Sequence, residues 1–288
     1  MYQELRAALK TLEEGRAVAR GLPEPEKAFL RTAWVEWLRK KTLPKNSGEK
    51  ILNAVRYCQT HGFNASQDGR RALKVASLAH NPLFDVQKKI FERIAERTGA
   101  AFIYPAMGFD VHFLPANANF LEITPDELPK DIAKQRPRNL LYLRRKAEDL
   151  TAADAEETRK SLGGKGTVLV LKGIQSVLGN KELCTLFERT KPAHVLAMET
   201  PARQYCAGSA YLPAITPELE RLLENKGFRE STGKYFTANE QRLLERIHET
   251  AASHFAFDDG HFPGIRTKVY EKHPNPTTRE NLIKAHNA

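Results

Sequence analysis

The chain has 288 residues, of which 41% are hydrophobic and 28% are charged, as in an ordinary soluble globular protein. This length suffices for one large domain or two modest ones. No apolar run approaches the roughly 20 residues that span a bilayer, and the charged segment 1–16 has no signal-peptide core. Three scattered cysteines without C-x-x-C spacing argue against disulfides and zinc. We therefore expect a cytoplasmic protein without membrane contact.

The chain is basic, with 45 Lys and Arg against 35 Asp and Glu and a net charge of +10. The excess is spread along the chain rather than gathered into a tail. It favours an anionic partner, which includes nucleic acid, acidic proteins and phosphorylated small molecules.

Residues 1–98 are typical of consecutive helices. Apolar side chains recur at helical spacing in the first segment, which contains Leu5 and Leu12, and in the segment that contains Trp34 and Trp37. A third helix is expected around residues 51–61. Two more are expected at Arg71 to Ala79 and Leu83 to Arg97, where Thr98-Gly99 ends the series. These residues predict an all-helical N-terminal domain.

From residue 99 the pattern changes to short apolar runs separated by helical stretches. We expect a helix at 154–162 and another at 182–190. The five runs that predict buried strands are 101–104, 120–123, 139–143, 167–171 and 193–198. Continuous apolar strands that alternate with helices indicate a parallel sheet covered on both faces.

The last third predicts two helices and one strand. Residues 216–228 begin with Thr216-Pro217 and end with Gly227, which are strong helix start and stop signals. An amphipathic helix is expected at about 239–255, and a strand at 266–272. The sequence thus predicts an α/β domain with a doubly wound, mostly parallel sheet over residues 99–275, followed by a polar tail at 276–288.

The order of these pieces resembles class I S-adenosylmethionine-dependent methyltransferases over about residues 95–273. In that family a strand and turn lie under the cofactor, the next strands carry acids, and a helix ending L-L-x-x-x-G-F precedes an antiparallel hairpin. The matching segments here are Phe102 to Asp110, Phe120 to Glu122, Leu143 to Asp149, Val168 to Gly173, Leu222 to Phe228 and Val269 to Lys272.

The resemblance implies a cofactor site beyond the carboxyl ends of the strands. S-adenosylmethionine would be the cofactor, the helical domain would cover the cleft or select the substrate, and a methyl group would pass in line to a nucleophilic atom of a small molecule or nucleic acid. Lys172, at the end of the fourth strand, would bind an anionic substrate or act as a base. The expected cofactor-binding residues are Tyr104, Pro105, Gly108, Asp110, Glu122 (with Asp126 as its substitute), Glu148 and Asp149.

Other interpretations remain open. Gly108 stands alone where the family usually has two or three glycines, which favours a methyltransferase-like binding module without cofactor. A different nucleotide-using enzyme is a second alternative, although G-x-G-x-x-G is absent. A solvated loop residue or a helix cap is the alternative interpretation of each acid. The histidines and aspartates between His248 and His261 match no zinc pattern, so no metal is expected.

Overall fold

The computed structural model describes residues 1–20, 67–107, 110–111, 114–125, 127, 138–163, 166–172, 179–200, 215–254 and 264–273, and the side chains of 15–20 and 67–81 lie outside the description. The described helices are α1 (Tyr2–Arg20), α4 (Gln67–Thr98), η2 (Ala147–Asp149), α6 (Ala152–Leu162), α7 (Asn180–Thr190), α8 (Pro217–Asn225), α9 (Thr232–Tyr235) and α10 (Ala238–His254). The described strands are β1 (Ala101–Pro105), β2 (Phe120–Thr124), β3 (Leu140–Arg144), β4 (Thr167–Lys172), β5 (His194–Glu199), β6 (Phe228–Glu230) and β7 (Arg266–Lys272).

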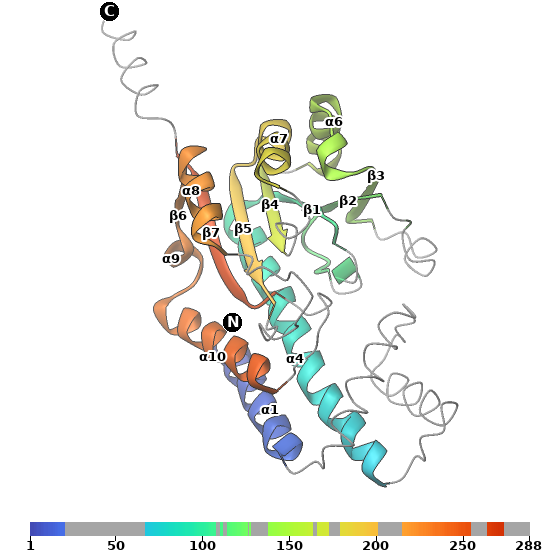
Figure 1. Cartoon of the computed structure of the whole chain (residues 1–288), viewed down its shortest axis with the longest axis vertical. Coiled ribbons are helices and arrows are strands. Elements are labelled where there is room, and N and C mark those ends of the chain that lie inside the picture. The colour runs from blue at the N-terminus through green and yellow to red at the C-terminus, as the bar shows by residue number, and fades with distance from the viewer. Residues whose placement is uncertain are drawn as a thin grey trace, which may run out of the picture.

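The described strands form one seven-stranded sheet in the order β3-β2-β1-β4-β5-β7-β6 (Figure 1). The pairs that β1 to β5 form among themselves are all parallel. β7 runs antiparallel to both β5 and β6. The expectation of a mostly parallel α/β sheet is confirmed.

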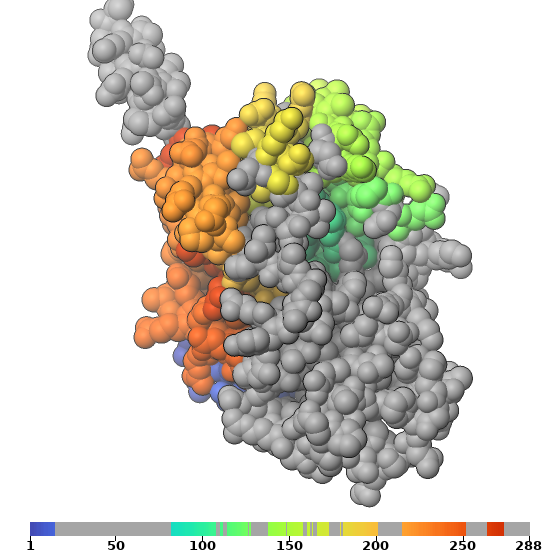
Figure 2. Space-filling view, in the orientation of Figure 1, coloured from blue at the N-terminus to red at the C-terminus, as the bar shows by residue number. Residues whose placement is uncertain are grey.

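Helices cover both faces of the sheet (Figure 1). On one face, buried apolar residues of α1, α4 and α10 pack against strand residues such as Phe102, Phe120, Val170 and Leu196. On the other face, residues of α6, α7 and α8 pack against the alternate strand positions. Figure 2 shows the yellow surface of α7 between the orange α8 and the green α6. Because strand side chains alternate between faces, both sides of the central strands are apolar, which explains their unbroken hydrophobic runs.

An aromatic cluster joins α4 to the sheet. The rings of Phe102 and Phe120 stack with centroids 4.9 Å apart. The Phe91 ring meets both edge-on, at 5.3 and 5.4 Å. Such ring geometries are favourable beyond the area that they bury. The C-terminal half of α4 is therefore fixed on the sheet, next to β1 and β2.

The predicted break between the two helices at 71–79 and 83–97 is wrong. α4 runs from Gln67 to Thr98 as one helix with Pro82 inside it. A proline inside a helix costs about 3 kcal/mol because it removes one backbone hydrogen bond and crowds the preceding turn. The residues that follow it, Leu83 and Phe84, are 0% and 2% exposed, and their burial offsets this cost.

The helix at 217–225 forms as its sequence signals predict. The Thr216 side chain accepts a hydrogen bond from the Leu219 amide at 3.1 Å, and Pro217 occupies the first helical turn. Gly227 adopts φ = 79°, the left-handed conformation that ends helices and that glycine tolerates best. β6 starts at the next residue, so this helix end sets where the last hairpin begins.

The described helices include none that is long and apolar enough to cross a membrane. α1 and the second half of α4 contribute Leu5, Leu12, Leu83 and Ile90 to the same core as the sheet. α1 packs on α4 and α10, and the second half of α4 packs on the sheet, so these two helices share the core of the α/β domain.

Candidate functional site

The sheet has a switch point between β1 and β4. After β1 the chain continues to β2 on one side, whereas after β4 it continues to β5 on the other. The two connections therefore diverge at the carboxyl ends of these strands. In open α/β sheets this is where ligands bind.

Three polar side chains meet at this switch point. The Nζ of Lys172, the last residue of β4, lies 2.5 Å from Oδ2 of Asp110, which follows β1. The hydroxyl of Tyr104, on β1, donates a hydrogen bond to the same oxygen. All three are buried: the side chains of Lys172 and Asp110 are 6% and 1% exposed, and Tyr104 is 1% exposed. We call these residues the Asp110 cluster.

Neighbouring elements fix the geometry of the Asp110 cluster. Tyr104 shares a sheet face with Phe102, two positions earlier, and its ring lies 5.9 Å from the Phe91 ring of α4. Lys172 shares that face with Val170, because strand side chains alternate. The strand pattern therefore directs both side chains toward α4, and Asp110 lies between them.

The turn after β1 is strained. Ala106 has φ = 52°, and its amide donates to the Ile123 carbonyl at 2.8 Å. For a residue with a Cβ this left-handed conformation costs roughly 1–2 kcal/mol. Strain of this kind concentrates at functional sites. It lies here at the position where the family resemblance implies a glycine.

Burial governs the electrostatics of the Asp110 cluster. Loss of solvent lowers the pKa of Lys172, while the charge and hydrogen bond of Asp110 act in the opposite direction. Burial, followed by the charge of Asp110, raises the pKa of Tyr104 well above its usual range, and Glu122 adds to the effect. Tyr104 therefore remains a hydrogen-bond donor at neutral pH, and Lys172 releases its proton more readily than an exposed lysine.

Glu122 is the second acid near the switch point. It is the third residue of β2 and lies opposite Tyr104 in the parallel pairing of β1 with β2. It is 3% exposed, and its charge acts on Tyr104. β1 and β2 are neighbouring parallel strands, as expected. Asp110 follows β1, whereas Glu122 lies inside β2, two residues before its end, rather than at its tip.

The remaining predicted site residues are placed differently. Pro105 is the buried last residue of β1. Gly108 and Asp126 lie outside the described residues. Glu148 and Asp149 belong to η2, which follows β3 at the sheet edge; Asp149 is exposed there, and η2 packs against α7. η2 thus follows the edge strand, which β2 separates from β1.

Sequence reasoning missed a buried glutamine near the same edge. Gln87, on α4, is 0% exposed, and its Oε1 accepts a hydrogen bond from the Gly264 amide at 2.6 Å. A Cβ at Gly264 would lie 2.6 Å from Cβ of Met198, which pairs with Lys172. The sequence contains a signal for a buried polar residue here, because Gln87 lies between Leu83 and Ile90 in the apolar stripe of the helix.

A second, partly buried network of charged side chains joins β5, β7 and α10. Glu199, the last residue of β5, accepts hydrogen bonds from the Ile215 amide at 3.0 Å and from Arg266 at 2.9 Å. Arg266 also binds both carboxylate oxygens of Glu245, through Nε at 3.1 and 3.0 Å. Hydrogen bonds to these acids raise the pKa of Arg266. These contacts hold the end of β5, the start of β7 and α10 together, so we assign the network a structural role.

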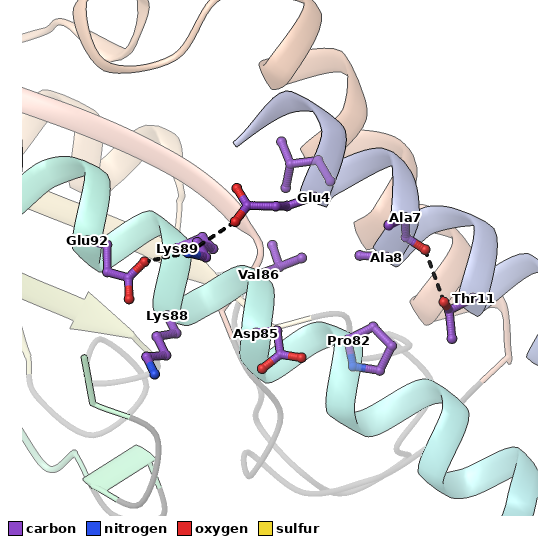
Figure 3. A pocket seen from close by; sticks show the side chains of 11 residues that line it. Glu4, Ala7, Ala8, Thr11, Pro82, Asp85, Val86, Lys88, Lys89 and Glu92 are labelled. Carbon is purple, nitrogen blue, oxygen red and sulfur yellow. Dashed lines mark hydrogen bonds and ion pairs between the residues drawn. The ribbon is translucent and has the colours of Figure 1, made fainter. Parts of the chain in front are cut away.

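A groove of about 420 Å³ lies between α1 and α4 (Figure 3). Lys89 spans it, with Nζ 3.1 Å from Glu4 and 2.9 Å from Glu92. Glu4 also pairs with the N-terminal amine at 2.8 Å, so both glutamates have a cationic partner, and the groove is lined by α1 and α4 rather than by the carboxyl ends of the strands. We therefore place the candidate site at the Asp110 cluster.

Together, the sheet and the Asp110 cluster define an open α/β domain with a buried group of polar side chains at its switch point. No protein-family model and no curated protein sequence matches the chain. Among solved structures, the crystal structure of EvdMO1 is similar at 12% identity and a TM-score of 0.32. The match covers 51% of this chain and 36% of that chain, so this chain spans about a third of the other protein's length. A likeness at this level carries no argument about fold or function.

Proposed function

We propose that the chain is an S-adenosylmethionine-dependent methyltransferase of the class I type. The observation that carries this proposal is the strand order β3-β2-β1-β4-β5-β7-β6, with β7 antiparallel to β5 and β6. The sequence resemblance implies a closing antiparallel hairpin after the helix that ends at Gly227-Phe228. β6 and β7 occupy that place, and α9 and α10 lie between them.

The acids near the switch point suit the proposed cofactor. Asp110 and Glu122 are buried at adjacent strands, where carboxylates accept hydrogen bonds from ribose hydroxyls and stabilise a nearby positive charge. When bound, S-adenosylmethionine would supply an activated methyl group on a cationic sulfur. The chain would contribute chiefly orientation, by fixing Asp110 through Tyr104 and keeping water away with the aromatic cluster. Lys172 would act beside the acceptor, at the end of β4.

The charge distribution favours an anionic acceptor such as nucleic acid. Residues 15–81 contain thirteen Lys and Arg against five Asp and Glu, so this segment carries most of the net charge of +10. The basic excess is therefore concentrated in this segment and is not spread along the whole chain as we had expected. Phosphate neutralisation by such a segment produces binding that weakens steeply with salt.

Calorimetric titration tests the proposal. We expect saturable binding of S-adenosylmethionine and of S-adenosylhomocysteine and no binding of NAD. Glu122→Gln should weaken both cofactors at least tenfold, because it removes a charge beside Tyr104. Glu220→Gln is the matched control, since Glu220 is half-buried on α8 and pairs with Lys268 at 2.6 Å, on the opposite sheet face. Absence of binding by the folded wild-type protein would refute the proposal.

A cofactor-free binding module is the second candidate. The occupation of Asp110 by Lys172 and the presence of Ala106 at the strained turn favour it. This candidate predicts RNA or DNA binding with a steep salt dependence and no heat of binding with either cofactor.

A further inference from the structure

We propose that the Asp110 cluster is a cation-binding site that the ammonium of Lys172 fills within the chain, and that the cationic methyl donor must displace it. The ligand class is a sulfonium or ammonium group that binds the Asp110 carboxylate. This inference rests on the proposed function. It adds that Lys172 competes with the donor and thereby sets how the site discriminates donor from demethylated product.

The first argument is one of charge. Asp110 is 1% exposed, and its Oδ2 already accepts from Lys172 at 2.5 Å and from Tyr104. Two like charges beside one buried carboxylate repel strongly, because the surroundings screen them poorly. A cationic donor and the Lys172 ammonium therefore exclude each other at Asp110. A neutral thioether product meets no such conflict.

The second argument concerns which group moves. Tyr104 is held by its strand and by the Phe91 ring 5.9 Å away. Asp110 is held by Tyr104 and by an amide hydrogen bond to the Met107 carbonyl at 3.2 Å. Lys172 is the last residue of β4 and has a flexible four-carbon side chain. Displacement of the lysine thus preserves the carboxylate and its hydroxyl partner in place.

The third argument concerns the cost of the displacement. Burial disfavours the charged form of Lys172, which its pKa shift reflects. Transfer of the ammonium to water restores its hydration and offsets the loss of the ion pair. The exchange replaces one cation by another at Asp110, so the buried carboxylate is never left uncompensated.

The test compares the dissociation constants of S-adenosylmethionine and S-adenosylhomocysteine by calorimetry. In Lys172→Met we expect the ratio of donor to product dissociation constants to fall at least tenfold, because the competing charge is gone. The double variant Lys172→Met/Asp110→Asn should return the ratio to near the wild-type value, since it lacks both charges. Lys226→Met, which removes a half-buried lysine paired with the exposed Glu188, should leave the ratio unchanged.

A second measurement uses the wild-type protein and is independent of variant stability. Acetylation of lysines, followed by mass spectrometry, should label Lys172 slowly without ligand, because its side chain is 6% exposed. Saturating S-adenosylmethionine should raise this rate at least threefold relative to Lys226, and S-adenosylhomocysteine should not.

The outcomes separate the two proposals. If both cofactors bind and neither the ratio in Lys172→Met nor the labelling of Lys172 changes, the displacement is overturned and the proposed function stands. If neither cofactor binds the folded protein, both proposals fall.

Discussion

We expect substitutions of Lys172 and Asp110 to have strongly non-additive effects on the free energy of unfolding. Its two side chains are 6% and 1% exposed, and Nζ lies 2.5 Å from Oδ2. Removal of one partner of such a pair leaves an uncompensated buried charge and typically costs about 3–5 kcal/mol. Removal of both charges leaves apolar and amide groups of similar size, which costs much less. We expect Lys172→Met and Asp110→Asn each to destabilise the protein strongly, and the double variant to recover roughly 2–4 kcal/mol relative to their sum.

Urea unfolding followed by far-ultraviolet circular dichroism measures these free energies, provided that the slope with urea stays constant. The matched control is the Lys226–Glu188 pair, whose Nζ and Oε1 are 2.9 Å apart but whose glutamate side chain is 68% exposed. Its double-mutant cycle should show no measurable coupling, because solvent screens the pair. If the two substitutions in the Asp110 cluster prove additive, Lys172 and Asp110 are not joined in a buried pair and the geometry of the site is wrong.

Three further predictions concern other positions. Burial, aided by Arg266, lowers the pKa of His248 from 6.5 to about 4, so the unfolded chain takes up a proton first as pH falls through this window. The free energy of unfolding should therefore drop by about 2 kcal/mol between pH 7.5 and 5, and His248→Gln should flatten that slope; equal slopes in urea titrations would contradict this. Gly264→Ala should cost about 1–3 kcal/mol, measured by urea unfolding, because the new Cβ meets the Met198 Cβ at 2.6 Å. Ala106→Gly and Lys191→Gly should each stabilise the protein by roughly 0.5–1 kcal/mol in the same assay, because glycine adopts the left-handed backbone at these positions without strain. A loss of stability at both positions would show that the backbone is not strained there.

The sequence was sufficient to predict most of the sheet. The apolar runs at 101–104 and 167–171 became β1 and β4 with one residue added to each. These strands are buried on both faces, so their composition alone identifies them. β6, a strand of three residues with two of them exposed, has no such signature and was missed. The continuity of α4 through Pro82 was also missed, because local sequence records the cost of the proline but not the packing that offsets it.

The site was predicted in part, and the limit is physical. Asp110 and Glu122 were identified because an acid after a buried strand is visible in the sequence. Lys172 was also among the predicted site residues, but its pairing with Asp110 was not predicted, since the two lie 62 residues apart and meet only because β4 pairs with β1. Glu148 and Asp149 follow a strand in the same manner, but β3 lies at the sheet edge, away from the switch point. Strand order, which depends on long-range packing, decides which strand ends meet.

The strand order shows why the charge of Lys172 needs a partner. It follows Val168 and Val170 on the face covered by α4, so its stem lies in an apolar layer and its ammonium needs a counter-ion there. Asp110, next to the adjacent strand, supplies that charge, and Tyr104 fixes the acceptor oxygen. A fold that needed only stability would do as well with apolar residues of similar volume, because buried ion pairs stabilise little in net terms. One carboxylate, one ammonium and one hydroxyl buried together at the carboxyl ends of β1 and β4 are therefore better explained by the cation exchange that we propose than by stability alone.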